Sequence, residues 1–197
     1  MAVLALVTWP ERVARRCRTL LVRALIFFGA LHGFLEAAPT KEYQVKAVFL
    51  FNFAQFVDWP AESFAAPNSP VVIGVLGDDP FDGLLDDAVR GETAHGRPLA
   101  VQRFKRVSEI ETCHVLFIGP KDSQHLAEIL RDLQGRNILT VGESENFAKS
   151  GGIIRFMTDN GKIRLRINVD AAHDANLKLS SKLLRPAEIV HARRTES

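Results

Sequence analysis

The feature that most restricts the fold is a series of short, continuous apolar runs separated by stretches with helical spacing. These runs do not alternate apolar with polar residues, as half-exposed strands do. Strands that are apolar on both faces are typical of a parallel sheet covered by helices on both sides. The four runs lie at residues 71–76, 99–104, 115–118 and 137–141. We therefore predict an α/β domain whose sheet is mainly parallel and flanked by helices.

Helical spacing precedes and separates these runs. Residues 41–57 repeat apolar side chains every three or four positions and add several phenylalanines, which predicts a well-buried first helix. Trp59-Pro60 is expected to end it, because proline disfavours helical geometry at the preceding residue. Residues 81–89 and 126–133 predict two further helices, and Asp78 or Asp79 is expected to cap the one that starts at Pro80.

The last third of the domain does not continue this alternation of apolar runs and helical stretches. Residues 153–157 and 163–167 flank Asp159-Asn160-Gly161, which predicts a C-terminal antiparallel hairpin. In its second strand Arg164 and Arg166 alternate with apolar residues, so one face is expected to be buried and the other basic and solvated. Asp170 is the expected N-cap of a following helix, and residues 177–184 suggest a final packed helix.

The N-terminus has the pattern of an export signal. Five arginines precede an apolar run at residues 24–35, and small residues follow it. A cut after Ala37 would leave residues 38–190 as the domain and 191–197 as a polar tail. An uncleaved membrane anchor is the alternative, but the run is shorter than the roughly 20 residues that span a bilayer. We therefore expect a cleaved signal peptide at 1–37 and no membrane insertion afterwards.

The charge of the chain does not favour nucleic acid as a partner. The formal net charge is +2, and the excess lies in residues 1–37, which hold five arginines and two glutamates. Binding to phosphate backbones requires a concentrated excess of lysine and arginine. The predicted domain is close to neutral, so nucleic-acid binding is not expected.

Cysteine usage excludes an intrachain disulfide in the predicted domain. Cys17 lies in the predicted signal, which leaves Cys113 alone. Cys113 precedes an apolar run and is interpreted as a small buried side chain, since free cysteine is among the most buried residue types. An intermolecular disulfide or a reactive thiol is the alternative.

No catalytic constellation can be recognised in the sequence. The metal-binding pattern H-E-x-x-H, the C-x-x-C pair, the G-x-S-x-G elbow and the phosphate-binding loop G-x-x-x-x-G-K-[ST] are all absent. The histidines are scattered without metal-ligand spacing. We therefore expect no enzyme activity, no cofactor and no metal.

Several blocks, in order, resemble the YfiR-like family. The first block contains the phenylalanine-rich helix and Trp59-Pro60, and the others follow through the remainder of the domain. The blocks are residues 46–60, 75–81, 113–118 and 138–141, then Phe147, and then residues 151–154, 167–168 and 179–184. Together they extend over almost all of the predicted domain.

The resemblance implies a function in signalling. Members of the family look like periplasmic, non-catalytic repressors that bind the periplasmic sensor region of a membrane-bound diguanylate cyclase and tend to form homodimers. Such a protein would lower cyclic-di-GMP and restrain biofilm formation. The alternative is a periplasmic small-ligand-binding sensor component for a histidine kinase or a transporter, with its ligand at the strand ends.

The chain departs from the family at its cysteines. Members with structural disulfides carry a cysteine in the first strand that can pair with the one matching Cys113, and Gly74 is the expected equivalent here. A second pair, near Phe147 and Gly151, is also missing. No redox control through disulfides is therefore expected.

We expect the partner-binding surface on the late hairpin and the nearby strand ends. Exposed charged strands and strand-end loops are available for contacts, whereas the helix faces are needed for the core. The candidate residues are Arg164, Arg166, Asp78 and Asp79, with the loops after Leu76 and Ile118.

Overall fold

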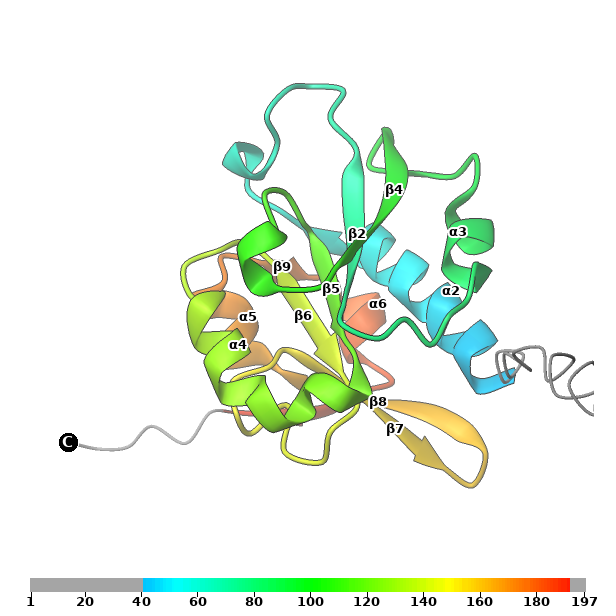
Figure 1. Ribbon diagram of the computed structural model, residues 1–197, viewed down its shortest axis with the longest axis vertical. Helices are drawn as coiled ribbons and strands as arrows, with labels where there is room; N and C mark the ends of the chain where they lie inside the picture. The colour runs from blue at the N-terminus through cyan, green and yellow to red at the C-terminus, as the bar shows by residue number, and fades with distance from the viewer. Residues whose placement is uncertain (1–40, 192–197) are drawn as a thin grey trace, which may run out of the picture. The chain divides into compact units, whose positions relative to one another are not determined.

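The computed structural model describes residues 41–191, and their largest feature is a mixed sheet (Figure 1). Eight strands of this segment pair in the order β10-β8-β7-β6-β5-β2-β4-β3. Their bounds are β2 Val71–Leu76, β3 Thr93–Ala94, β4 Arg97–Phe104, β5 Val115–Ile118, β6 Leu139–Gly142, β7 Ile154–Asp159, β8 Lys162–Asn168 and β10 Glu188–Val190. The pairs β7–β8 and β3–β4 are antiparallel and the others are parallel. The predicted α/β class with a mainly parallel sheet is confirmed.

Helices pack on both faces of this sheet. The five α-helices of the described segment are α2 Lys41–Phe56, α3 Leu84–Val89, α4 Leu126–Asp132, α5 Val169–Asp174 and α6 Ser181–Leu184. Three short 3₁₀ turns join them, η1 Ala61–Ser63, η2 Val107–Glu109 and η3 Pro120–His125. No helix within residues 41–191 is long and apolar enough to cross a membrane.

Two hydrophobic clusters explain why the strands are apolar throughout. Val75 and Phe117 point into a cluster shared with α2, α3, α5 and α6. Leu76 and Leu116, their neighbours in sequence, point into a second cluster shared with α4. Because consecutive side chains of a strand face opposite sides, both sides of the central strands must be apolar.

Helix α2 is buried through its aromatic side chains. Phe53 is fully buried and stacks on Phe156 of β7, with 5.8 Å between the ring centroids. Phe49 meets Phe156 edge-on at 6.0 Å. The helix ends at Phe56, and Val57 opens the two-residue strand β1 (Val57–Asp58), which pairs with β9 (Lys178–Leu179). The predicted helix is therefore confirmed with an end one residue earlier.

The predicted late hairpin is present, and it projects beyond the rest of the sheet (Figure 1). Asp159 faces Lys162 across the closing pair of strands. Asn160 and Gly161 between them have φ angles of 50° and 71°. Positive φ at both central positions is the geometry of a tight two-residue turn, which asparagine and glycine adopt most readily.

Both predicted aspartate caps are wrong. Helix α3 begins at Leu84, after Gly83, and Asp79 instead accepts a hydrogen bond from the Phe81 backbone N–H at 2.7 Å within the preceding turn. At α5 the cap is Asn168, whose Oδ1 accepts from the Ala171 N–H at 3.0 Å. The amide of Asn168 takes this role because the strand leads directly into the helix.

The predicted final helix over 177–184 is also wrong, and the segment is divided into a strand and a short helix. The Ser180 N–H donates to the Phe56 carbonyl at 2.9 Å, which holds the chain extended as β9. The Ser180 side chain then accepts from the Lys182 N–H and starts the four-residue helix α6. The predicted signal peptide at 1–37, the cut after Ala37 and residues 192–197 of the predicted tail lie outside the described residues.

Candidate functional site

The carboxyl edge of the sheet brings together the loops that follow its parallel strands. β2 and β5 end side by side, because the Gly119 N–H donates to the Leu76 carbonyl at 3.0 Å. Gly77 likewise donates to Phe104 at 2.8 Å. In parallel α/β sheets, functional residues commonly lie in the loops that follow the carboxyl ends of the strands. Asp78 and Asp79, which follow β2, lie in these loops.

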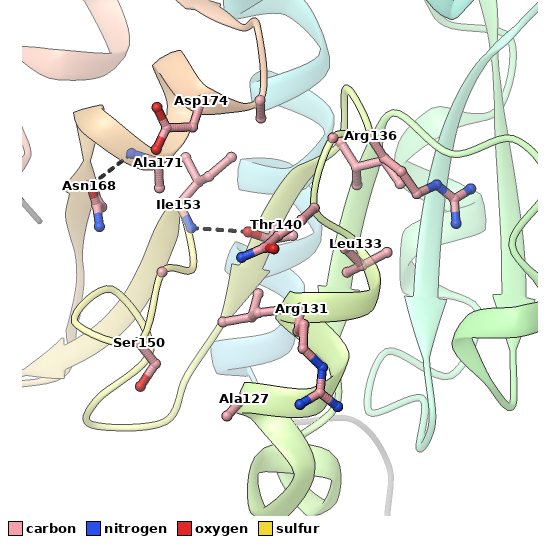
Figure 2. A pocket seen from close by; sticks show the side chains of 16 residues that line it. Ala127, Arg131, Leu133, Arg136, Thr140, Ser150, Ile153, Asn168, Ala171 and Asp174 are labelled. Atoms are coloured by element: carbon pink, nitrogen blue, oxygen red, sulfur yellow. Dashed lines mark hydrogen bonds between the residues drawn. The ribbon is translucent and has the colours of Figure 1, made fainter.

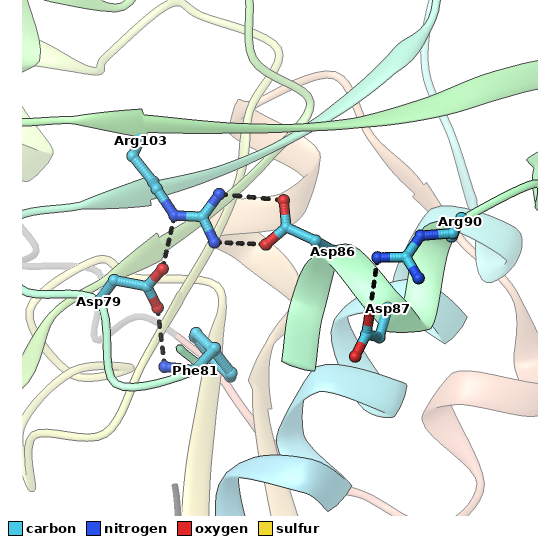
Figure 3. Close-up of polar contacts among 6 residues, drawn as sticks. All are labelled: Asp79, Phe81, Asp86, Asp87, Arg90 and Arg103. Atoms are coloured by element: carbon cyan, nitrogen blue, oxygen red, sulfur yellow. Dashed lines mark hydrogen bonds and ion pairs between the residues drawn. The ribbon is translucent and has the colours of Figure 1, made fainter. Parts of the chain in front are cut away.

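Asp79 is held by an intramolecular ion-pair network (Figure 3). Arg103 of β4 donates Nε to Asp79 Oδ2 at 2.6 Å and both terminal nitrogens to Asp86 of α3, at 3.1 and 2.5 Å. The hydrogen bonds from Arg103 lower the pKa of Asp86, and the same contacts raise the pKa of Arg103. The network fastens the loop after β2 to β4, so Asp79 has little freedom to bind a partner.

Asp78 lies on the surface of the same edge. Its carboxylate forms an ion pair with Lys121 of η3, and both side chains are exposed. The hydrogen bond to Asp78 raises the pKa of Lys121. Exposed pairs of this kind contribute little stability. Both charged side chains are therefore accessible at the surface, and the free energy of folding depends little on their ion pair.

The two hairpin arginines have different environments. Arg164 is 57% exposed, and the nearest carboxylate, Asp159, lies 3.6 Å away. Arg166 is only 22% exposed and donates to Glu188 at 2.9 Å. Strand β10 places Glu188 opposite Arg166 in the parallel register. The expected exposure of the basic face is therefore confirmed for Arg164 and wrong for Arg166.

A buried lysine beside this hairpin was missed from the sequence. Lys46 of α2 is 2% exposed, and its Nζ pairs with Glu42 and lies 2.9 Å from Glu143 Oε1. The ammonium also lies 4.6 Å from the centre of the Tyr43 ring and 5.9 Å from that of Phe156. We call Glu42, Tyr43, Lys46 and Glu143 the Lys46 cluster. Its signal in the sequence is a lysine on the apolar face of the first helix, four residues after a glutamate.

The titration of the cluster follows from these contacts. The hydrogen bond from Lys46 lowers the pKa of Glu42. Burial raises the pKa of Tyr43 to about 12, with a further contribution from Glu143 and Glu42. Tyr43 Oη donates to Glu143 Oε2 at 3.4 Å. At neutral pH Glu42 is therefore ionised and Tyr43 is neutral.

A cleft of about 520 Å³ joins the Lys46 cluster to the hairpin. It opens where β7 leaves β6, since these two strands pair only over Val141 and Gly142. Lining residues include Glu42, Lys46, Glu143, Arg155, Thr158 and Arg164. The structure thus brings Arg164 to a charged cleft, whereas Asp78 and Asp79 are not among its lining residues.

A second hollow, of about 270 Å³, lies between α4 and α5 (Figure 2). Its buried polar groups already have partners. Thr140 Oγ1 accepts from the Ile153 N–H at 3.0 Å, and the Asn168 side chain bonds both Ala171 and Ala148. A ligand would find few buried polar groups left to bind. This hollow therefore gives weak support to the small-ligand alternative.

The described residues contain no group of three or more histidine, cysteine, aspartate or glutamate side chains that could hold a metal. Cys113 is free and buried, as predicted. Burial raises the pKa of its thiol to about 12. Because the thiolate is the nucleophilic form, burial disfavours reaction of Cys113 with reagents from solvent.

Gly74 lies directly against Cys113. A Cβ built at Gly74 would stand 2.8 Å from Cys113 Sγ and 2.8 Å from the Phe104 ring. A disulfide holds its Cβ atoms about 3.8 Å apart, so each Cβ lies even closer to the opposite sulfur. The resemblance-based match of Gly74 to a disulfide position is consistent with this geometry.

Gly74→Cys is therefore expected to form a disulfide with Cys113 under oxidising conditions. Closing a loop of about 40 residues gives about 4 kcal/mol in the chain-entropy model, offset by about 1–3 kcal/mol of overpacking. Gly74→Ala is the control, because it adds the crowding without the bond. Intact mass should show the loss of two hydrogens, and reductant should lower the melting temperature of the cysteine variant alone. Two free thiols after oxidation would show that the backbone keeps the pair apart.

Comparisons with known proteins identify the family of the chain. A family model described as YfiR/HmsC-like matches residues 43–188, well over half of the 197 residues. No curated protein matches the chain. At the level of the family, these proteins are periplasmic, non-catalytic regulators of diguanylate cyclases. From the extent of this match, the chain belongs to the YfiR/HmsC-like family.

Proposed function

We propose that this protein is exported to the periplasm, binds the periplasmic sensor region of a membrane-bound diguanylate cyclase and represses it. The observation that carries the proposal is the family match over residues 43–188. The described segment has no metal-binding cluster, and its cysteine is buried, so neither feature supports a catalytic role. Cleavage of residues 1–37 and a homodimeric state complete the proposal.

The hairpin supplies the surface that we propose for the partner. Lys162 and Arg164 are exposed on β8, and Arg155 of β7 lines the same cleft as Arg164. Asp78 and Lys121 form a second charged point on the same edge of the sheet. Asp79 and Arg166 contribute by holding this surface in shape, through Arg103 and Glu188 respectively. Charges at the rim of an interface govern partner choice and association rate more than affinity.

Repression requires a minimum difference in binding free energy between the two states of the cyclase. A repressor shifts its target only through a difference in affinity for the active and inactive states. Moving a cyclase from mostly active to mostly inactive requires about 5 kcal/mol of that difference. Such a difference requires a specific contact that one state of the target forms and the other loses.

Deleting the gene is expected to raise cyclic-di-GMP and biofilm formation, and the rise should vanish when the catalytic site of the partner cyclase is also inactivated. A chain carrying Lys162→Glu and Arg164→Glu should complement the deletion less well than the wild type, because both exposed charges are reversed. Arg166 is left intact, since a glutamate there would face Glu188. Arg90→Glu, at an exposed arginine directly after α3, is the control and should complement fully.

Unchanged cyclic-di-GMP after deletion, under every growth condition tried, would contradict repression and favour the small-ligand alternative. Full complementation by the folded double variant would remove the hairpin from the interface. These two outcomes are distinguishable. The deletion tests whether the protein represses a cyclase at all, whereas the double variant tests only whether the hairpin contacts the cyclase.

A further inference from the structure

The opposite, amino edge of the sheet contains a buried histidine that the proposed function does not use. His114, directly before β5, is 1% exposed. It lies beneath the segment 59–70, which connects β1 to β2 and contains η1. Buried titratable groups of this kind couple protonation to conformation when the charged form loses its contacts.

The hydrogen bonds of His114 require a neutral ring. Nδ1 accepts from the Val72 backbone N–H at 3.0 Å. Nε2 lies 3.2 Å from the Ser63 carbonyl oxygen and donates to it, since a carbonyl can only accept. The neutral tautomer protonated on Nε2 satisfies both partners. A proton added at Nδ1 would leave two donors facing each other at the start of β2.

Aromatic packing buries the ring further. Phe64 stacks on His114 with 4.5 Å between centroids and 20° between planes. Trp59 meets the ring edge-on at 5.7 Å, and its indole N–H donates to the His114 carbonyl at 3.2 Å. Desolvation by this packing lowers the pKa of His114. Three residues of the 59–70 segment therefore close over one ring.

The charges near His114 do not compensate a positive ring. Arg97 of β4 lies over Phe64 at 3.8 Å, and its charge also lowers the pKa of His114. Arg136, before β6, donates to the Ile110 carbonyl. Glu62 of η1 and Asp58 of β1 are exposed, and neither forms an ion pair with His114 among the described residues. Cys113, the residue before His114, is neutral.

The 59–70 segment is also linked, through side-chain hydrogen bonds, to the turn between α5 and β9. Asn137 donates Nδ2 to Ser63 Oγ at 3.1 Å. Asn176, in the turn between α5 and β9, donates to Asn137 Oδ1 at 3.1 Å. Release of Ser63 would therefore also remove a hydrogen bond of Asn137, the residue that Asn176 of the α5–β9 turn contacts.

We propose that His114 is an acid-sensitive latch, which holds the 59–70 segment on the amino edge while its ring is neutral and releases it when Nδ1 takes a proton from solvent. The direction of the pH dependence follows from the contacts of the His114 ring. The ring binds its proton more weakly in the closed form than in the open one, so the closed form is favoured above the ordinary histidine value of about 6.5. That preference is lost as the pH falls below it.

Hydrogen exchange of residues 59–72 in the purified protein, measured from pH 7.5 to 5 and corrected for intrinsic exchange rates, tests the latch. One proton is taken up on opening, so the opening constant should rise up to about tenfold per pH unit below about 6.5, until the closed form is itself protonated. His114→Asn keeps an acceptor near Nδ1 but cannot titrate, so its opening should be less dependent on pH. His173→Asn, at an exposed histidine, is the control and should keep the wild-type response.

An opening constant in the wild type that does not change between pH 7.5 and 5 would overturn the proposal. So would an identical pH response in His114→Asn. If that variant fails to fold, NMR titration of the His114 ring in the wild type provides an independent test. A titration midpoint at or above 6.5 would contradict the latch, and one below it, together with the exchange slope, supports it.

Discussion

Phe53→Ala is expected to lower the free energy of unfolding by about 3–5 kcal/mol, the usual cost of removing a fully buried phenylalanine. Phe53 is 0% exposed and packs on Phe156 and Phe49, which join α2 to the β7 strand of the hairpin. Its removal would leave a cavity that neighbouring rings cannot fill without leaving their own contacts. Denaturant unfolding at neutral pH measures the change.

Phe51→Ala provides the matched control on the same helix. Phe51 is only half-buried, so its truncation removes less apolar area from the core and should cost clearly less. Equal losses for the two variants would contradict the placement of Phe53 at the helix–sheet contact.

Lys46→Met is expected to lower the free energy of unfolding by about 2–4 kcal/mol. Removing one partner of a buried ion pair usually costs about 3–5 kcal/mol, and here the partial exposure of Glu42 and Glu143 reduces the loss. Without the ammonium, two carboxylates would face each other beside Tyr43. Lys41→Met is the control, because Lys41 is exposed at the start of the same helix.

The difference in free energy of unfolding between the wild type and Lys46→Met should also depend on pH. Lys46 depresses the pKa of Glu42 in the folded state. The stability that this contact contributes is therefore present above the ordinary glutamate value of about 4.3 and is lost as the pH falls through the folded-state value. The difference between the wild type and Lys46→Met should narrow in acid. A difference that stays constant down to pH 3 would show that packing of the lysine stem, and not its charge, stabilises the cluster.

The strands could be predicted because their side chains report directly on burial. Val75 and Leu76 face opposite clusters, so the run has to be apolar at every position. The hairpin could be predicted because Asn160-Gly161 supplies the positive φ angles of its turn. Local chemistry dictates the structure in both cases.

The errors at residues 177–184 and at Arg166 arise where distant contacts decide the structure. Ser180 bonds the Phe56 carbonyl, more than a hundred residues earlier in the chain, and this contact sets a strand where leucine spacing favours a helix. The partial burial of Arg166 depends on Glu188 in β10, whose three residues carry too little pattern to be recognised as a strand. The Lys46 cluster likewise depends on Glu143, contributed by the loop after β6.

The position of the hairpin gives the proposed function its physical basis. β7 and β8 extend past the point where β6 ends (Figure 1). Lys162 and Arg164 belong to this extended part, because they pair with Asp159 and Met157, beyond the last residue of β7 that pairs with β6. Phe156 and Leu165 on the other face pack toward α2 and the core. One face of the hairpin is thus needed for stability, whereas Lys162 and Arg164 on the other face are exposed, so substitutions there should leave the fold intact.

The most direct test of repression is the rate of cyclic-di-GMP synthesis by the partner cyclase, reconstituted in lipid nanodiscs that expose both membrane faces, with purified residues 38–197 added. The proposal predicts a saturable fall in rate that depends on the periplasmic region of the cyclase. The Lys162→Glu, Arg164→Glu variant should require a higher concentration, and Arg90→Glu should act like the wild type. A rate unchanged at every concentration of folded protein would contradict the account.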